Sequence, residues 1–308
     1  MSEKKLSGFI AVNKPSGMTS SDVVVKVRGI LRSATGDKKI KVGHLGTLDP
    51  NGAGVLPIAV GAGTKLFEYT TKKIKKYRAG ICFGKTTDTL DSYGEVTETS
   101  DVLPTAEELK AVLPELTGDV MQVPPAYSSL SVGGVKAYKL ARRGGEVVIA
   151  ARPVKIFDIS VQREIEPGHY VLDIVCEGGT YIRSLVRDIA ARLGALAYMS
   201  FIIRTKSGEF LMENSVNLEE FALNPTKFVM PIETVTSGFE RFDVPAQFEK
   251  QVRCGVKVKI GSPENSKLLW ARNYPIKFLH FFQGFFDTGV CDGFIFSGYK
   301  YLVALYFK

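Results

Sequence analysis

The chain has 308 residues, of which 45% are hydrophobic, and Lys and Arg outnumber Asp and Glu by 40 to 32. This length favours one large domain plus a smaller one, and the hydrophobic content is that of a globular protein with a core. The sequence has no run of about 18 apolar residues and no hydrophobic segment directly after its first residues. We therefore expect no membrane span, no secretory signal and a cytoplasmic protein.

The ionisable residues narrow the class of partner. The four cysteines and three histidines lie too far apart for C-x-x-C or zinc-ligand spacing, so we expect free thiols and no metal site. The formal net charge of +8 favours a polyanionic partner, because basic side chains displace counterions from phosphates. Charge alone does not separate nucleic-acid-binding proteins from other basic proteins.

The spacing of apolar residues predicts strands and helices that alternate irregularly. The expected strands pair like hairpins rather than as repeated parallel crossover units, which indicates an α+β fold. The helix expected over 181–193 has the most regular apolar face, and the strand expected over 75–83 buries alternate residues. The other expected strands are 8–13, 55–60, 153–162 and 169–176, and the other expected helices are 105–117, 135–143 and one that begins at Thr19–Ser21.

The composition changes near residue 236. The residues that follow are rich in Phe, Tyr and Gly and contain short β-like runs. We therefore expect a main domain over 1–236 and a small β-rich domain over 237–308.

The segment 43–52 presents an aspartate on a loop rich in glycine. Pro50 restricts Asp49 to an extended or turn conformation, and a basic stretch that includes Lys41 precedes the segment. In one interpretation the Asp49 carboxylate faces a polyanionic substrate. In the other it caps its own turn, as Asp does in many Asp-Pro-Asn-Gly sequences.

The segment 178–183 joins a strand to the most regular helix. Thr180 is a candidate N-cap. Arg183 falls in the first turn, where the positive end of the helix dipole makes an arginine unfavourable without a partner. It is therefore either a solvated side chain or one half of an ion pair with a carboxylate from another loop.

Eight segments resemble, in order, the hallmark segments of the TruB family of pseudouridine synthases. Together they span residues 8 to 210. They are residues 13–20, 44–50, 54–57, 76–77, 84–91, 122–129, 179–183 and 203–205. The resemblance implies the catalytic fold of these enzymes, with a mostly antiparallel central sheet, and a small C-terminal RNA-binding domain of the PUA type. Residues 263–308 depart from the PUA pattern, so we expect a divergent domain there.

The resemblance assigns roles residue by residue. Asp49 corresponds to the catalytic aspartate, Arg183 to the arginine paired with it, and Tyr181 to an active-site tyrosine. The substrate-binding residues are Tyr77, which stacks on the uracil, His44, which takes the space left by the extruded base, Ile202, which packs against the base, and Lys14 and Lys41, which contact phosphates.

The implied reaction converts uridine to pseudouridine at position 55 in the T loop of tRNA. Because nothing is oxidised or added, we expect no cofactor and no metal, and we expect a monomer bound to the T arm. Three alternatives remain open at this point. They are an RNA-folding factor that uses the same cleft, a guide-RNA-dependent relative within a ribonucleoprotein, and a nucleoside hydrolase, although the metal-binding aspartate cluster of the last is not apparent.

Overall fold

The computed structural model describes residues 6–67, 73–145 and 147–236, and the short segments 240–242, 247, 258–259, 269–271 and 301–302. The chain divides into two compact units, Met1–Pro231 and Ile232–Lys308. In the second unit, β14 (Glu240–Phe242) pairs with β16 (Leu269–Ala271), and β15 (Val258–Lys259) pairs with β17 (Tyr301–Leu302). The predicted PUA-like domain lies largely outside the described residues and stays a prediction, as does its boundary at residue 236.

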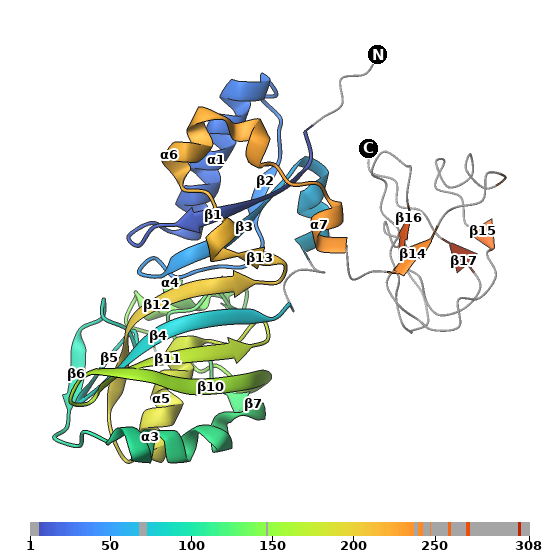
Figure 1. The fold of residues 1–308 in the computed structure, drawn as a ribbon. Helices are drawn as coiled ribbons and strands as arrows, with labels where there is room; N and C mark the ends of the chain where they lie inside the picture. The colour runs from blue at the N-terminus through green and yellow to red at the C-terminus, as the bar shows by residue number, and fades with distance from the viewer. Residues whose placement is uncertain are drawn as a thin grey trace. The chain divides into compact units, whose positions relative to one another are not determined.

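The first unit is built on one central sheet (Figure 1) with the strand order β1-β3-β12-β4-β11-β10-β7. Two short strands extend it, β2 (Val42–His44) beside β3 and β13 (Phe210–Leu211) beside β12. The strands of the main path are β1 (Gly8–Lys14), β3 (Ala53–Val60), β4 (Lys75–Phe83), β7 (Gly118–Gln122), β10 (Arg152–Glu166), β11 (His169–Cys176) and β12 (Ala197–Ser207).

The pairing confirms the predicted α+β fold with a mostly antiparallel sheet. Every pairing within this sheet is antiparallel except that of β3 with β12. The strands β4 and β11 have the predicted bounds. Two small hairpins stand outside the sheet, β5 (Lys85–Thr87) with β6 (Val96–Thr99), and β8 (Ser131–Val132) with β9 (Val135–Lys136).

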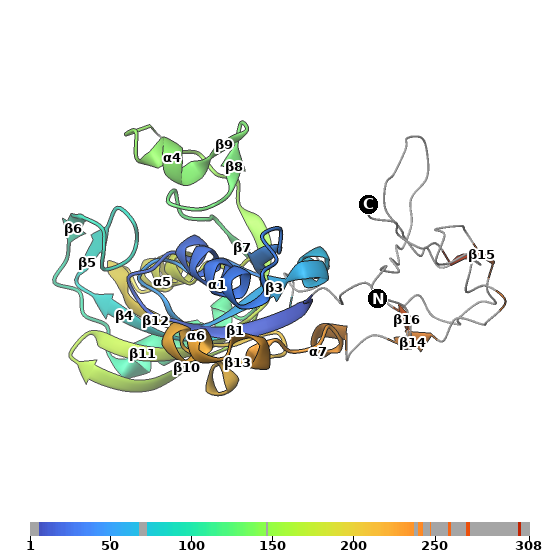
Figure 2. The same cartoon turned by 90° about the horizontal axis from the view of Figure 1, so that it is seen from above.

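Helices cover one face of the sheet and close the core. In Figure 2, α1 (Ser20–Thr35) and α5 (Ile182–Arg192) lie on the same face, from which β8, β9 and α4 (Ala137–Ala141) project. The core combines apolar side chains of α1, α5 and α3 (Ala106–Val112) with those of the strands. The remaining helical segments are η1 (Gly61–Leu66), η2 (Leu113–Leu116), η3 (Met212–Asn214), α6 (Leu218–Leu223), η4 (Pro225–Phe228) and α7 (Glu233–Thr236).

Local sequence explains where the first helix begins and ends. The Thr19 hydroxyl accepts from the Asp22 amide at 3.0 Å, and the Asp22 carboxylate accepts from the Thr19 amide at 2.9 Å. This capping box satisfies two amides that the first helical turn leaves without partners. Gly36 ends the helix in the left-handed conformation, as is common at helix C-termini.

The described part of the chain bears on the expectations for membrane spans, metal sites and cysteines. None of its helices has the length and hydropathy needed to cross a bilayer. Nor do its His, Cys, Asp and Glu side chains form any group of three that could hold a metal ion. Cys82 and Cys176 are free thiols, whereas Cys254 and Cys291 lie outside the described residues.

The strand β12 was not predicted, although it occupies the middle of the sheet. Its parallel pairing with β3 brings Arg204 opposite Gly54. At Gly54, φ is +103°, and a Cβ atom there would lie 2.3 Å from the carbonyl oxygen of Arg204. Only glycine lets the two backbones approach this closely.

We predict that Gly54→Ala destabilises the first unit far more than Gly17→Ala does. Gly17 also has a positive φ, +89°, but a Cβ atom at Gly17 would have nothing within 4 Å of it. The control therefore carries the conformational cost alone, about 1–2 kcal/mol, whereas Gly54→Ala adds a backbone clash and costs roughly 3 kcal/mol or more. Urea denaturation of both variants measures the difference, and equal losses would contradict the close-approach argument.

Candidate active site

A cavity of about 320 Å³ gathers five of the predicted site residues. Asp49 comes from the loop before β3, Tyr77 from β4, Tyr181 and Arg183 from the start of α5, and Ile202 from β12. Elements far apart in the sequence thus contribute to one pocket.

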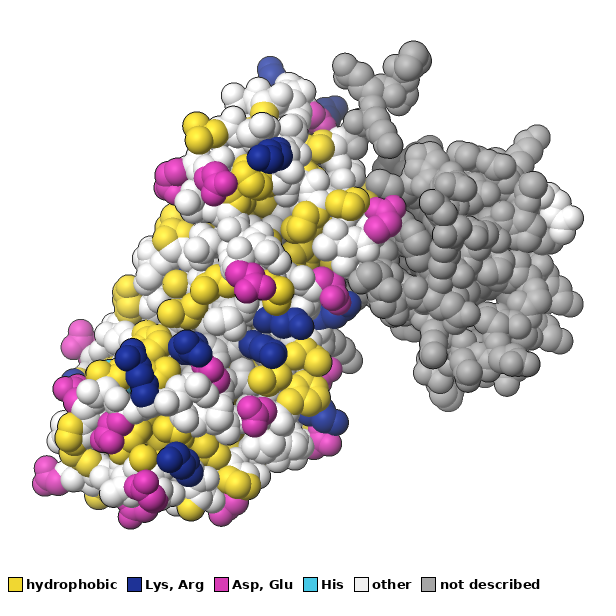
Figure 3. Space-filling view, in the orientation of Figure 1, with side chains coloured by type: hydrophobic (Ala, Val, Ile, Leu, Met, Phe, Trp, Pro, Cys, Tyr) yellow, Lys and Arg dark blue, Asp and Glu magenta, His cyan; other side chains and the backbone are white. Residues whose placement is uncertain are grey.

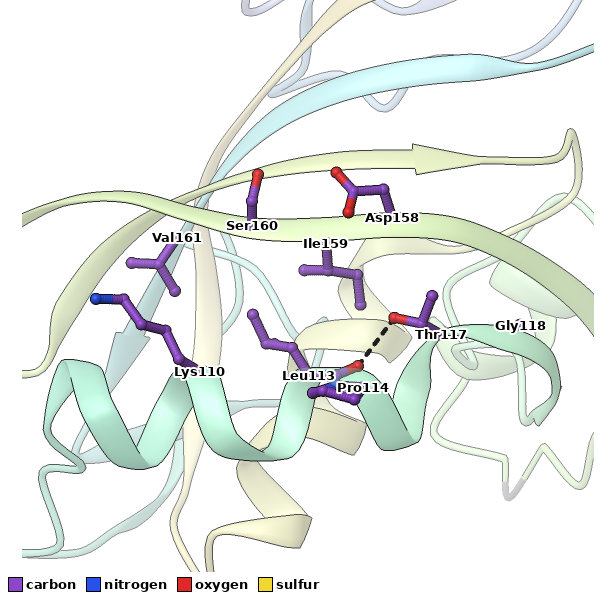
Figure 4. A pocket seen from close by; sticks show the side chains of 9 residues that line it. All are labelled: Lys110, Leu113, Pro114, Thr117, Gly118, Asp158, Ile159, Ser160 and Val161. Carbon is purple, nitrogen blue, oxygen red and sulfur yellow. Dashed lines mark hydrogen bonds between the residues drawn. The ribbon is translucent and has the colours of Figure 1, made fainter.

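A second hollow, of about 660 Å³, lies between β10 and the helical segment formed by α3 and η2 (Figure 4). Leu113 and Ile159 point toward each other across it, while Asp158 and Ser160 point away from the helix. It contains none of the predicted site residues, so the smaller cavity is the candidate active site.

The central interaction of the cavity is a two-pronged ion pair. Arg183 Nε donates to Asp49 Oδ2 at 2.9 Å, and Arg183 Nη2 donates to Asp49 Oδ1 at 3.1 Å. Arg183 is 5% exposed and the Asp49 side chain 29% exposed. This paired geometry fixes the orientation of a carboxylate that still reaches the cavity. Of the alternatives left open by the sequence, Arg183 is one half of an ion pair with a carboxylate from another loop, not a solvated side chain, and the Asp49 carboxylate binds this arginine rather than its own turn.

The other donors of Arg183 hold two loops. Nη1 donates to the Thr89 carbonyl and Nη2 to the Tyr127 carbonyl, both at 3.0 Å. A second carboxylate, Asp91, lies 3.7 Å from Nε. The guanidinium is therefore almost fully hydrogen-bonded, which is what a buried charge requires.

The turn that supplies Thr89 and Asp91 holds a left-handed residue. Leu90 has φ = 62°, and in the described part of the chain it is the only residue other than glycine with a positive φ. Hydrogen bonds from Thr87 Oγ1 to the Asp91 carbonyl and from Thr89 Oγ1 to Asp91 Oδ1 hold the turn. A bulky residue in this conformation costs roughly 1–3 kcal/mol, so the turn is determined by its surroundings.

Tyr77 and Ile202 form apolar parts of the cavity wall. Tyr77 is 7% exposed and Ile202 5% exposed. Burial raises the pKa of Tyr77 to about 12, although the nearby Arg204 partly offsets this effect. The Tyr77 hydroxyl therefore stays protonated at neutral pH, and its aromatic ring gives the cavity a flat, uncharged surface.

Tyr181 is placed by its backbone. Its amide donates to Gln122 Oε1 at 2.9 Å, and its carbonyl accepts from Gln122 Nε2 at 3.1 Å. The prediction that Thr180 caps α5 is wrong, because its hydroxyl donates to the Glu177 carbonyl instead and the N-cap residue is Tyr181. A guanidinium, that of Arg152, lies 5.1 Å from the centre of the Tyr181 ring.

Arg204 is a site residue that sequence reasoning missed. It is completely buried and donates to the carbonyls of Val55 at 2.8 Å, Thr47 at 3.1 Å and Gly46 at 3.2 Å. It thereby ties β12 to the loop that carries Asp49. The sequence could have pointed to Arg204 as a site residue, because it lies within segment 203–205, one of the segments that resemble the family.

The remaining three predicted residues do not line the cavity. Lys14 has no exposed surface, and its ammonium donates to the carbonyls of Pro15 at 2.8 Å and Pro50 at 3.2 Å, beneath the Asp49 loop. This burial does not favour a phosphate contact. His44 lies on β2 with a buried Nδ1 that has no partner among the described residues, and burial lowers its pKa. Lys41 is exposed just before β2.

Comparison with known proteins agrees with this architecture. A family model described as TruB family pseudouridylate synthase (N terminal domain) matches residues 32–182. The tRNA pseudouridine synthase B of Caldanaerobacter subterraneus subsp. tengcongensis is 45% identical, over 70% of this chain and 74% of that protein. The enzyme of the same name from Dinoroseobacter shibae is 36% identical, over 87% of this chain and 88% of that protein. The chain belongs to the TruB family of pseudouridine synthases.

A solved structure of another protein has the same fold as this TruB chain. A chain in the crystal structure of a Cbf5-Nop10-Gar1 complex superposes with a TM-score of 0.63 and 26% identity, over 86% of this chain and 74% of that one. The predicted pseudouridine synthase fold and the predicted isomerase class are therefore confirmed. Membership of this family also excludes the nucleoside hydrolase interpretation.

We predict a pH-dependent stability difference between the protein and its Lys14→Met variant. Burial lowers the pKa of Lys14 from 10.5 to about 8. Between these pH values the unfolded chain holds a proton on Lys14 that the folded chain has released, so the free energy of unfolding rises with pH. The variant lacks this contribution.

The free energy of unfolding of the wild type should therefore rise relative to that of Lys14→Met between about pH 8 and 10, by at most ~1.4 kcal/mol per pH unit. Urea titrations at several pH values measure it, with the exposed Lys26→Met as a control for the lost charge. A difference that stays constant or falls with pH would contradict the buried placement.

Proposed function

We propose that this enzyme isomerises uridine to pseudouridine at position 55 in the T loop of tRNA, with Asp49 acting on the ribose. The observation that carries the proposal is the Asp49–Arg183 pair at a cavity walled by Tyr77 and Ile202. The names of the relatives support tRNA as the substrate.

The carboxylate has to be ionised and correctly placed for either available route. In one, an Asp49 oxygen forms a bond to C1′ as the N1–C1′ bond breaks. In the other, Asp49 accepts a sugar proton and the same bond breaks by elimination. The base leaves with the electron pair, turns and rejoins through C5. The Asp49–C1′ bond breaks as the C5–C1′ bond forms in the first route, and Asp49 returns the proton to the sugar in the second. C5 then loses its own proton. The two hydrogen bonds from Arg183 hold the carboxylate oxygens in a fixed orientation toward the cavity.

The uridine reaches this carboxylate only after it has left the RNA stack, as in other enzymes that act on bases. In the proposal the uracil stacks on Tyr77 and packs against Ile202, with Tyr181 at the same wall. Stacking on one aromatic ring contributes about 1–3 kcal/mol per base, which offsets part of the cost of unstacking. The neutral imidazole of His44, favoured by its lowered pKa, suits the space that the extruded base vacates.

The lysines have separate roles in this proposal. Lys14 positions the Asp49 loop through the Pro50 carbonyl, in place of the phosphate contact expected from the sequence. Lys41, which is exposed, contacts phosphates of the T arm. Since substrate and product have the same atoms, the isomerisation needs no oxidant, reductant or group donor. We place the reaction in the cytoplasm and assign it to a monomer.

We predict that Asp49→Asn abolishes single-turnover conversion of an unmodified tRNA transcript while tRNA affinity stays within about tenfold, or ~1.4 kcal/mol. Asparagine keeps the shape and the turn-capping ability of aspartate but loses the charge and the reactive oxygen. Arg183→Lys should give a graded loss, because lysine keeps the charge without the two-pronged contact. Pseudouridine mapping and filter binding measure the two quantities, and turnover by purified Asp49→Asn would refute the catalytic assignment.

The positive charge of the loop before β2 should contribute to the affinity for tRNA. Acidic and basic side chains are interspersed over the face of the first unit seen in Figure 3, so the net charge is not concentrated in one patch there. Lys38, Lys39 and Lys41, however, are exposed together just before the site loop.

We predict that changing these three lysines to Gln makes the log–log dependence of tRNA affinity on salt shallower by roughly 1 to 3 units, since each phosphate contact contributes about 0.9. The single-turnover rate at saturating tRNA should change little. An unaltered salt slope would place the RNA on another surface.

A further inference from the structure

Lys75 is a buried cation that opens into the candidate active site. It begins β4, and its side chain is on the same buried face as that of Tyr77, two residues further on. It is 7% exposed and lines the same cavity as Asp49 and Tyr77. Within the described part of the chain, no hydrogen-bond acceptor or carboxylate partner contacts its ammonium.

Three other cations near the cavity donate to acceptors within the protein. Arg183 donates to Asp49 and to two loop carbonyls. Arg204 donates to three backbone carbonyls, and Lys14 to two. The Lys75 side chain is buried except where it meets the cavity, and an ammonium held there without a protein acceptor points to an acceptor that arrives with the ligand.

The loop before Asp49 leaves room for this ammonium. Gly46 has φ = +132°, and a Cβ atom at Gly46 would lie 3.2 Å from Lys75 Nζ. A side chain at this position would therefore crowd the lysine. The Gly46 carbonyl also accepts a hydrogen bond from Arg204, which fixes the position of the loop next to Lys75.

Strand geometry brings a bound base next to Lys75. Residues two apart on a strand point to the same side and lie roughly 6.5–7 Å apart. A pyrimidine stacked on Tyr77 therefore has an edge within reach of the lysine. The groups that this edge offers to a cation are the carbonyl oxygens of the base.

We propose that Lys75 is a catalytic residue, whose ammonium donates to a carbonyl oxygen of the extruded pyrimidine and stabilises the charge that the base acquires as its N1–C1′ bond breaks. The inference rests on the proposed function. In this step the bonding electron pair moves to N1 and is delocalised onto the carbonyl oxygens. Asp49 supplies electrons to the sugar, by bonding to C1′ or by accepting a sugar proton. Lys75 keeps its protons and acts through its charge.

The electrostatics of the cavity agree with this role. Burial, followed by the positive charge of Arg204, lowers the pKa of Lys75 to about 8, while the neighbouring Cys176 acts in the opposite direction. No carboxylate contributes to this balance. A negatively charged oxygen placed beside the ammonium would favour its protonated form.

The test compares Lys75→Met with Lys76→Met, a matched variant whose lysine occupies the exposed face of the same strand. Single-turnover breakage of the N1–C1′ bond is measured at saturating tRNA by separating the digested nucleosides. We expect Lys75→Met to be slower by roughly 10²-fold, the usual effect of removing one donor to a developing negative charge. Lys76→Met should lose less than about threefold, and thermal unfolding verifies that both variants fold.

A second substrate separates charge stabilisation from a structural role. A tRNA with 5-fluorouridine at the target position carries a base that is a better leaving group, since fluorine withdraws electron density. The ratio of wild-type to Lys75→Met rates should then be at least about threefold smaller than with uridine. A structural role slows both substrates equally.

The possible results can be told apart. Equal slowing with both substrates, or a Lys75→Met rate within about threefold of the wild type, overturns the assignment of Lys75 while the proposed function stands. Failure of the wild-type protein to convert tRNA at all overturns the proposed function and this inference with it.

Discussion

A carboxylate in a half-buried cavity keeps one orientation only when a fixed cation lies beside it, and the Asp49–Arg183 pair organises the site in this way. Arg183 satisfies both Asp49 oxygens, but burying a guanidinium creates a need for further acceptors. The Thr89 and Tyr127 carbonyls meet that need. The arginine therefore draws two distant loops to the cavity, and one of them contains the left-handed residue Leu90.

Two other buried cations act on the backbone rather than on carboxylates. Arg204 and Lys14 donate to five backbone carbonyl groups, and three of these belong to residues close to Asp49 on either side. Such contacts fix the path of an irregular loop that has no ladder of its own. The loop is thus rigid for reasons that hydrophobic packing alone does not supply, which suits a nucleophile or base that must be placed in advance.

Regular periodicity was the part of the sequence that predicted structure well. The strands over 75–83 and 169–176 and the helix from 182 follow their apolar patterns. The strand β12 was not predicted because two register shifts interrupt its alternation of buried and exposed residues. The aspartate and its arginine were found through the resembling segments, whereas Arg204 and Lys75 were missed because a pattern of hydrophobicity treats every Lys and Arg as exposed.

The place of β12 in the sheet has a consequence for synthesis of the chain. Among the described strands it is the only link between the pair β1–β3 and the strands β4, β11, β10 and β7, yet it comes after all of them in sequence. A growing chain that has not reached β12 can form two separate half-sheets, but no strand pairing joins them. Asp49 then belongs to one half-sheet and Tyr77 to the other. The cavity closes only when a late strand is inserted between earlier ones, so a nascent or truncated chain has no assembled site with which to engage RNA prematurely.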